Sequence, residues 1–409
     1  MKFRDYQADI IERGSKIIKE KSFLYLAMEV RTGKTLTSLG IASKIKSRNV
    51  LFVTKKKAIS SIDTDYKLYA PKFGITITNY ESLHKVSGLF DLIIFDEAHS
   101  MGAFPKPSSR AKKAKELVRK NGCRVILMSG TPSPESYCQL YHQVYFCPGN
   151  PFRMFKNFYA FAKILVTIKQ KKFGGFTVND YKDGKKIILD RMSPFMISFS
   201  QKQAGFKVES FEKVLTVHLK PTSYYYINRL KKDLVLDGES ETVLADTAVK
   251  LMSKLHQMFS GTVKFESGNS KVLDHSKAEF IFEQFKHRKI GIFYKFKAEL
   301  LAIQEIFEDR ITTNLEEFNS TNKSIALQIQ SGREGISLKL ADCLVYYNID
   351  FSATSYWQSR DRMTTKDTKE NYLYWIFAYR GIEHKIYKAV TKKKDYTLSH
   401  FKKDLLNLK

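Results

Sequence analysis

Short apolar runs alternate with stretches of helical pattern from residue 23 onward, and this alternation limits the fold more than any other feature of the chain. Runs that are rich in Val, Ile and Phe and are followed by polar turn residues are typical of fully buried parallel strands. We therefore predict a doubly wound α/β unit in the N-terminal portion of the chain. Its strands are expected within FLYLAM (23–28), NVLFVT (49–54), ITITNY (75–80), DLIIFDEAH (91–99) and CRVILMSGTP (123–132).

A second series of the same kind begins late in the chain and predicts a second α/β unit. Its strands are expected within KIGIFYKF (289–296), SIALQIQSGREG (324–335), DCLVYYNID (342–350) and NYLYWIFAY (371–379). Between the two series, residues 151–213 carry 13 Lys and Arg against 5 Asp and Glu, and FGGFTVNDYKDGKK (173–186) has the pattern of a hairpin. We expect one unit at 1–150, a basic connector or protrusion at 151–213 and a second unit at 214–409.

The net charge indicates a polyanionic partner. Lys and Arg number 69 and Asp and Glu 42, which gives a formal net charge of +27. Solubility alone needs a net charge of only about 2 to 8 in a small domain, so nucleic acid is the partner that we expect, with plain solubility as the alternative. The chain has no apolar run of about 18 residues and its first residues are polar, which predicts neither a membrane span nor a secretory signal and favours a cytoplasmic location.

Gly33-Lys34-Thr35 follows an apolar run and precedes an apolar helical stretch. A helix N-terminus offers free backbone N–H groups and partial positive charge, so phosphate binds there, with Lys34 on the β- and γ-phosphates of ATP and Thr35 on Mg²⁺. Arg31 and Thr32, in the same loop, are counted with the ATP-binding residues. Met28 stands where the usual motif has its first glycine, and an ordinary strand-to-helix turn is the alternative.

Two adjacent carboxylates, Asp96 and Glu97, end a buried apolar run in DLIIFDEAH. In open α/β sheets, ligands bind at the carboxyl ends of the strands. Asp96 is expected to hold Mg²⁺ through water, and Glu97 to orient or deprotonate the water that attacks the γ-phosphate. A simple helix cap is the alternative for the pair.

The ordered motifs GKT, DEAH and SGTP (129–132) resemble those of superfamily 2 helicases, and further segments are similar to those of the Swi/Snf-type DNA translocases. The resemblance covers essentially the whole chain, in a compact form that looks like the stand-alone versions found in phages and other viruses. The further segments are FRDYQ (3–7), AMEVRTGKT (27–35), ITNYESL (77–83), LHQMFSG (255–261), SGREGISL (331–338), ADCLVYYNIDFSATSYWQSRDR (341–362) and GIEHKI (381–386).

The resemblance implies two RecA-like lobes with ATP bound between them. It makes Gln7 the adenine contact, and it makes Ser129 and Thr131 couple the ATP site to the second lobe, although a strand-to-turn cap is the alternative for these two. Gly335 would allow close backbone approach to the nucleotide. Gln358 and Arg362 would reach the γ-phosphate, with Arg362 as the arginine finger.

The resemblance also places nucleic-acid contacts in loops at one end of both sheets. Contacts of this type neutralise phosphates and read no sequence, and each lysine taken singly is also explained as a solvated surface group. The residues expected to make the contacts are Thr54, Lys55, Lys56, Asn79, Tyr80, Lys295, Lys297, Ser331 and Arg333.

We expect an ATP-dependent translocase or remodeller that moves along DNA, most simply duplex DNA. A strand-separating DNA or RNA helicase is one alternative, and a nucleic-acid-binding protein with a degenerate ATP site is another. The last motif, YWQSRDRMTTK (356–366), has Thr365 where the family has a second arginine. Arg360 or Lys366 could supply the missing charge, although a lysine lacks the bidentate fork of arginine.

Overall fold

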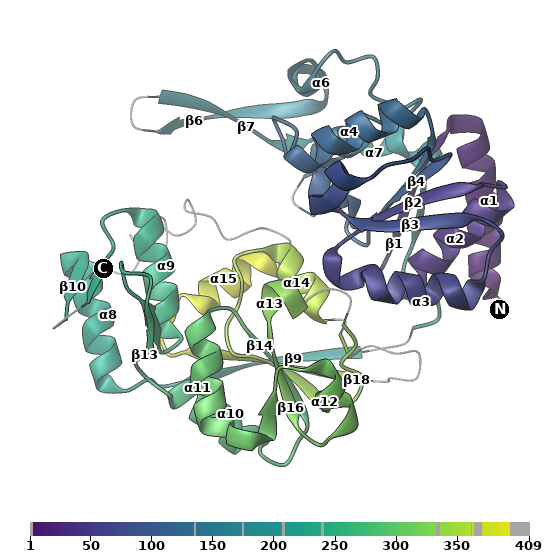
Figure 1. The fold of residues 1–409 in the computed structure, drawn as a ribbon. Coiled ribbons are helices and arrows are strands. Elements are labelled where there is room, and N and C mark those ends of the chain that lie inside the picture. Colours follow the sequence, from purple (N-terminus) through teal and green to yellow (C-terminus); the bar gives the residue numbers. More distant parts are fainter. Residues whose placement is uncertain are drawn as a thin grey trace. The chain divides into compact units, whose positions relative to one another are not determined.

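The structure is a computed structural model that describes residues 3–134, 136–173, 176–206, 209–238, 241–332, 336–360, 362–363 and 370–392. The chain divides into two compact units, residues 1–206 and 207–409, and each is described here by itself (Figure 1). Within the described ranges, every helix is too short or too polar to cross a lipid bilayer.

The first unit is built on a six-stranded parallel sheet with strand order β3-β2-β4-β5-β1-β8. Five of the six strands lie in the runs that the sequence predicts; β8 does not. Crossover helices connect the strands, as parallel pairing requires. The strands are β1 (Phe23–Met28), β2 (Asn49–Thr54), β3 (Gly74–Asn79), β4 (Leu92–Phe95), β5 (Arg124–Met128) and β8 (Met196–Phe199).

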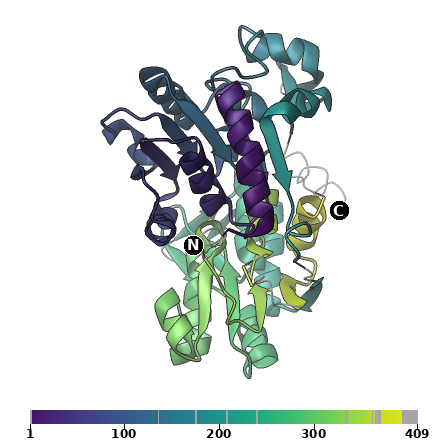
Figure 2. The same ribbon diagram turned by 90° about the vertical axis from the view of Figure 1, so that its right-hand side faces the viewer.

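Both faces of this sheet are buried, because side chains alternate between two hydrophobic clusters. Phe23 and Tyr25 of β1 belong to one cluster, and Leu24 and Leu26 belong to the other. The second cluster includes apolar residues of α1 (Asp5–Lys21), α2 (Lys34–Lys44) and α3 (Ile59–Tyr69), and Figure 2 shows α1 in purple along this unit. The first cluster includes residues of α4 (Ser109–Asn121), α5 (Gln139–Val144), α6 (Phe158–Leu165) and α7 (Ile187–Met192). The unit is therefore doubly wound.

Residues 151–206 lie in the first unit and include a long antiparallel hairpin, β6 (Val166–Phe173) with β7 (Phe176–Gly184). This confirms the hairpin that the sequence predicts around residues 173–186. The hairpin extends away from the sheet of its unit (Figure 1). The chain then returns through α7, and β8 pairs with β1 at the edge of the sheet.

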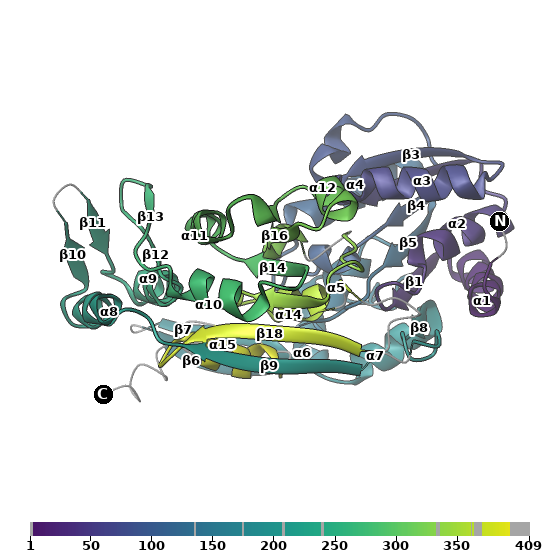
Figure 3. The same cartoon turned by 90° about the horizontal axis from the view of Figure 1, so that it is seen from below.

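The second unit repeats the architecture, with a six-stranded parallel sheet of order β15-β16-β14-β17-β18-β9. The nine-residue strands β9 and β18 lie side by side (Figure 3). Two short antiparallel pairs, β10 with β11 and β12 with β13, are added outside the sheet. The strands are β9 (Glu209–Val217), β10 (Val235–Asp237), β11 (Thr242–Leu244), β12 (Thr262–Lys264), β13 (Ser270–Val272), β14 (Ile290–Tyr294), β15 (Ile311–Thr312), β16 (Ser324–Gln328), β17 (Cys343–Tyr346) and β18 (Glu370–Ala378).

Two hydrophobic clusters again cover the two faces of this sheet. Leu344 and Tyr346 of β17 pack in the cluster of α8, α9 and α15, whereas Val345 packs in the cluster of α10 and α11. The fold is therefore two doubly wound lobes of the RecA-like type, as expected. The helices of this unit are α8 (Pro221–Asp233), α9 (Ala248–Phe259), α10 (Ser276–Phe285), α11 (Lys297–Phe307), α12 (Leu315–Ser320), α13 (Ile329–Gly332), α14 (Ala353–Arg360) and α15 (Glu383–Val390).

Candidate functional site

The loop between β1 and α2 requires a glycine at its last position. Gly33 has φ of 80°, a left-handed conformation that side chains rarely adopt. A Cβ atom at Gly33 would lie 2.5 Å from Gln7 Nε2. Arg31, two residues earlier, also has a positive φ of 62°. The loop therefore turns sharply into α2, whose N-terminus begins at Lys34 and presents free N–H groups.

The start of α1 holds this loop in place. Gln7 is buried; its Nε2 donates to Gly33 O at 3.4 Å, and its Oε1 accepts from Arg4 N at 3.1 Å. The Tyr6 hydroxyl donates to Thr32 O at 3.3 Å. The predicted adenine contact thus lies against the predicted phosphate loop, because α1 and the loop share these hydrogen bonds.

Residues that sequence reasoning did not assign to the site also hold the loop. Glu29 accepts a hydrogen bond from Gln201 N at 2.7 Å, and Gln201 Nε2 donates to Val30 O at 3.1 Å. Inside the loop, the buried Thr32 hydroxyl donates to Glu29 O at 2.7 Å, and Lys34 Nζ lies 3.4 Å from the same oxygen. Gln201 follows β8, a strand that the sequence analysis does not predict, so no local signal pointed to it.

Asp96 and Glu97 follow β4 at the same edge of the sheet as the loop after β1. Asp96 is partly buried, and its Oδ2 accepts a hydrogen bond from Thr54 Oγ1 at 2.9 Å. Burial raises the pKa of Asp96 to about 6, and the nearby Glu97 charge adds to the rise, while Lys34 acts against it. The electrostatic effect of Lys34 on Asp96 ties the predicted phosphate loop to the predicted metal-binding carboxylate.

Glu97 has the opposite electrostatic environment. Burial acts to raise its pKa, but the hydrogen bond and charge of His99, with Lys34 and Lys55, outweigh burial and hold the pKa well below its usual range. Glu97 has a positive φ of 49°, which turns its side chain sharply after the strand. His99, Lys34 and Lys55 therefore favour the ionised form of Glu97, whereas burial favours the protonated form of Asp96.

His99 links the carboxylates to the SGTP motif, and sequence reasoning did not single it out although it stands within DEAH. Its Nδ1 lies 3.2 Å from Glu97 Oε2 and 3.0 Å from Ser129 Oγ. Ser129 Oγ also accepts from Thr131 N at 3.1 Å. The buried Thr131 hydroxyl has no hydrogen-bond partner among the described residues. Ser129 thus lies one hydrogen bond from the Glu97–His99 pair, and Thr131 lies two hydrogen bonds from it.

The donor set at this edge fits magnesium bound together with phosphates. The described residues contain no group of three or more His, Cys, Asp or Glu side chains that could hold a metal ion without such help. Mg²⁺ is commonly held by one or two carboxylates, with waters and substrate phosphates completing its shell. The raised pKa of Asp96 and the Thr35 hydroxyl on the first turn of α2 match that pattern, since a cation beside Asp96 would favour its ionised form.

Two residues expected at the nucleic-acid surface of the first unit instead support Asp96. Thr54 is fully buried with its hydroxyl on Asp96, and the Tyr80 hydroxyl donates to Asp96 O at 2.5 Å from a buried ring. Asn79 accepts from Ser82 N at 3.0 Å and so caps the turn that follows β3. Of the lysines that follow β2, Lys55 is partly exposed and Lys56 is exposed. The lysines are therefore the residues of this set whose positions suit a phosphate backbone.

In the second unit, the two lysines after β14 are placed differently. Lys295 Nζ forms an ion pair with Asp350 Oδ1 at 2.9 Å, and both side chains are nearly buried, so this cation is engaged within its own unit. Lys297, at the start of α11, is exposed. Ser331 lies in α13. Arg333 and Gly335 lie outside the described residues.

Helix α14 carries the last motif. Gln358 lies in this helix, and Arg362 follows it with a nearly buried side chain whose Nη1 donates to Ile336 O at 3.3 Å. Arg360 forms an ion pair with Glu212 Oε1 at 2.5 Å. Glu212 also accepts hydrogen bonds from Tyr356, Trp375 and Tyr387. Arg360 is therefore bound within its unit, and Glu212 anchors the motif helix; nothing in the sequence near Glu212 predicts that role.

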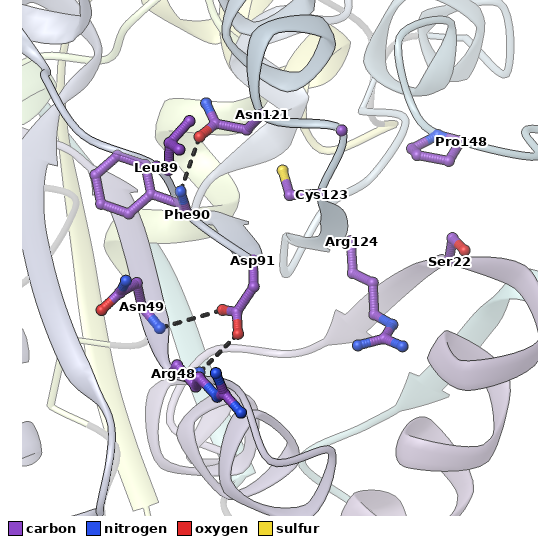
Figure 4. Close-up of a pocket in the computed structure, with 11 residues that line it drawn as sticks. Ser22, Arg48, Asn49, Leu89, Phe90, Asp91, Asn121, Cys123, Arg124 and Pro148 are labelled. Carbon is purple, nitrogen blue, oxygen red and sulfur yellow. Dashed lines mark hydrogen bonds between the residues drawn. The ribbon is translucent and has the colours of Figure 1, made fainter.

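A cavity of about 540 Å³ with a mixed polar and apolar lining lies at the opposite edge of the first sheet, around the amino ends of β1, β2, β4 and β5 (Figure 4). Asp91 Oδ2 accepts from Arg48 N at 2.7 Å, and its Oδ1 accepts from Asn49 N at 3.3 Å. These contacts hold the starts of neighbouring strands together. The predicted site residues lie at the carboxyl ends of the strands, so this cavity is separate from them.

Comparisons with known proteins give one family model and similar solved structures. A family model described as ResIII, "Type III restriction enzyme, res subunit", matches residues 1–72. The chain is similar to two solved structures of the Sulfolobus solfataricus SWI2/SNF2 ATPase core. The structure in complex with dsDNA is 16% identical to this chain and covers 98% of this chain and 92% of its own. The structure of the core domain is also 16% identical and covers 96% of this chain and 89% of its own. Both have a TM-score of 0.42. The comparison with curated proteins gives no match. In its motifs and in the family model that it matches, this chain resembles the helicase-type ATPases of superfamily 2.

Proposed function

We propose that this protein is a nucleic-acid-dependent ATPase of the Swi/Snf helicase type that couples ATP hydrolysis to movement along DNA, most simply duplex DNA. One observation carries the proposal. The glycine-ended loop at the N-terminus of α2 and the Asp96–Glu97 pair occupy one edge of one sheet, with Lys34 close enough to affect the pKa of both carboxyls. The net charge of +27 favours a nucleic-acid partner.

Each residue of this edge has a role in the proposed reaction. Lys34 and the N–H groups of α2 bind the β- and γ-phosphates. Glu97, kept ionised by His99, Lys34 and Lys55, accepts a proton from the attacking water. Thr35 and Asp96 are the residues that would hold Mg²⁺, which supplies neutralisation of the phosphate charge. Hydrogen bonds among His99, Ser129 and Thr131 give the site a route to respond to hydrolysis.

In the second unit, Gln358 and Arg362 are proposed to act on the γ-phosphate when the two lobes close. An arginine finger contributes a factor of about 10³ to 10⁵ to the rate of hydrolysis, so loss of Arg362 would reduce ATP hydrolysis to a very low rate. Arg360 is held by Glu212 and is not a candidate for the same task. The lysines after the strands, Lys55 and Lys297 among them, are proposed to hold the phosphates of the nucleic acid.

Phosphate release tests the proposal directly. It is measured without nucleic acid and with single-stranded DNA, duplex DNA or RNA. Lys34→Ala should abolish release, whereas Lys44→Ala should leave it unchanged, because Lys44 lies at the far end of the same helix in an exposed ion pair with Glu12. If duplex DNA gives no stimulation over the other conditions, the translocase assignment is wrong.

A strand-separating helicase is the second candidate, and the β6–β7 hairpin favours it. The hairpin extends from its unit and carries the lysines Lys169, Lys171, Lys172 and Lys182 (Figure 1). Such a projection can separate the strands of a duplex if a motor drives it forward. Opening of a short fork is compared with displacement of a third strand from a triplex. Fork opening alone supports the helicase, and third-strand displacement alone supports the translocase.

A further inference from the structure

A cavity of about 280 Å³ in the second unit combines cationic and aromatic side chains. It lies where the carboxyl ends of β9 and β18 meet one face of α8 and the end of α9. Val217 of β9 and Ala378 of β18 are register partners, and Tyr379 N donates to Val217 O at 2.8 Å. This pairing places His218 and Tyr379 side by side, with ring centroids 4.5 Å apart and planes 28° apart.

The cavity holds positive charge that no carboxylate of the described chain offsets through an ion pair. Lys231, on α8, lies 5.5 Å from the ring of Phe259, and Arg380 lies 5.2 Å from the ring of Tyr379. Burial lowers the pKa of Lys231, and the neighbouring Lys385 lowers it further. A bound anion would offset the unfavourable burial of this charge.

The aromatic surface narrows the class of anion. Tyr379 is 41% exposed, and Tyr224 and Asn228 of α8 also line the cavity. A simple inorganic anion would use the cations and leave the rings unused. Flat nucleobases stack on aromatic side chains, and cationic side chains beside the rings bind the adjoining phosphate. Asn228 adds an amide that can donate to and accept from a base edge.

We propose that this cavity binds one nucleotide unit, with the base on the aromatic surface of His218 and Tyr379 and the phosphate at Lys231 and Arg380. Two sources share this chemistry: a single-stranded segment of nucleic acid and a free nucleotide. The strand source rests on the proposed function, because it assumes that the protein works on nucleic acid. A duplex offers no free base face, so the cavity discriminates against duplex.

Binding to the full-length protein tests the proposal with three probes: a fluorescein-labelled oligothymidylate, a duplex of the same length, and free thymidine 5′-monophosphate. Stacking contributes about 1 to 3 kcal/mol per base, so Tyr379→Ala should weaken binding of the accepted probe about tenfold. Lys231→Ala should weaken it as well. Two neighbours serve as matched controls and should bind like the wild type. Tyr372→Ala removes an exposed tyrosine from β18, the strand that Tyr379 directly follows, and Lys232→Ala removes an exposed lysine from α8, the helix of Lys231.

The outcomes separate the two sources and the two proposals. If Tyr379→Ala and Lys231→Ala weaken binding of the oligothymidylate, the ligand is a single-stranded segment. If they weaken binding of the monophosphate alone, the ligand is a free nucleotide. If Tyr379→Ala and Lys231→Ala bind all three probes as the wild type does, the cavity proposal is wrong. Phosphate release without nucleic acid is measured on the same variants and should not change. Lys34→Ala should lose phosphate release and bind the accepted probe as the wild type does. If Lys34→Ala instead keeps full phosphate release, the proposed function fails while the result on probe binding stands.

Discussion

A fully buried ion pair in the second unit gives the sharpest stability prediction. Lys277 of α10 and Glu383 at the start of α15 are both 0% exposed, with Lys277 Nζ 2.7 Å from Glu383 Oε1. Lys277 Nζ also donates to Tyr347 O at 3.3 Å, and Glu383 Oε1 accepts from Ala378 N at 3.4 Å. Removing the lysine alone leaves a carboxylate in an apolar setting. We therefore expect Lys277→Met to cost far more than a typical surface change.

The cost follows from the charge that remains. Neutralising an ordinary glutamate at pH 7 costs about 3.7 kcal/mol, because its pKa is about 4.3 and each unit is worth about 1.36 kcal/mol. This agrees with the range of about 3 to 5 kcal/mol for breaking a buried ion pair. Adding Glu383→Gln removes the charge and keeps an amide oxygen near Ala378 N. The double variant should therefore recover most of the lost free energy of unfolding.

Tryptophan fluorescence during urea unfolding reports this unit selectively. The chain has two tryptophans, Trp357 and Trp375, and both lie in the second unit. With a urea dependence of about 2 to 3 kcal/mol per molar, Lys277→Met should lower the midpoint by about 1 to 2 M. Lys286→Met is the control, because it removes an exposed pair with Glu283 and should cost under about 1 kcal/mol.

The same experiment at pH 5 supplies a second check. The cost of protonating an ordinary glutamate falls there to about 1 kcal/mol, so the deficit of Lys277→Met should shrink as the pH is lowered. A midpoint that drops equally at pH 7 and pH 5, or a double variant as unstable as the single one, would refute the reasoning from an uncompensated charge. Loss of packing around the lysine stem would then be the better explanation.

Three further predictions concern the candidate site. Gly33→Ala should destabilise the first unit by about 1 to 3 kcal/mol and abolish nucleotide binding, measured by thermal unfolding and by binding of a fluorescent ATP analogue. The positive φ is strained for any side chain, and a Cβ would displace the Gln7 side chain that holds the loop. Asp96→Asn should abolish hydrolysis yet raise the stability of that unit at pH 7 by about 1 to 3 kcal/mol. The pKa of Asp96, raised to about 6, shows that the fold disfavours the ionised form, so stability is lost as the pH rises through 6; equal stabilisation at pH 4 and pH 7 would contradict this. Arg362→Ala should abolish phosphate release, Lys366→Ala only weaken it and Thr365→Arg raise it; near-normal turnover of Arg362→Ala would exclude it as the finger.

The sequence predicts the sheets well because buried parallel strands must be apolar throughout. FLYLAM and NVLFVT coincide with β1 and β2 in the structure. The strands that it does not predict have other patterns. β9 (ESFEKVLTV) mixes charged, polar and apolar residues at the edge of the second sheet. β8 (MISF) is a four-residue edge strand far along the chain from its partner β1. Pairing of such edges depends on tertiary contacts that no short window of sequence contains.

The candidate site shows a similar division between local and distant information. Gly33 and Lys34 could be placed because a loop that enters a helix has a local pattern. The roles of Thr54, Tyr80 and Lys295 depend on which neighbour each side chain meets across the sheet. Their positions directly after strands correctly predict that they lie at the carboxyl edge of each sheet. Their partners, Asp96 for Thr54 and Tyr80 and Asp350 for Lys295, lie more than ten residues away in the chain. Position alone therefore could not distinguish a surface contact from a buried support.

In the last motif, YWQSRDRMTTK, the sequence alone cannot say whether Arg360 replaces the arginine that is absent at Thr365; the contacts of Arg360 are needed. By sequence, Arg360 is two residues from Arg362 and carries the same charge. In the structure, Arg360 stacks over Trp357 with a distance of 4.8 Å to the ring centroid and pairs with Glu212. Four hydrogen-bonding side chains converge on that one carboxylate, so moving Arg360 would leave Glu212 short of a partner in a largely buried position. Arg360 therefore stabilises the motif helix, and Arg362 is the arginine that we propose as the finger.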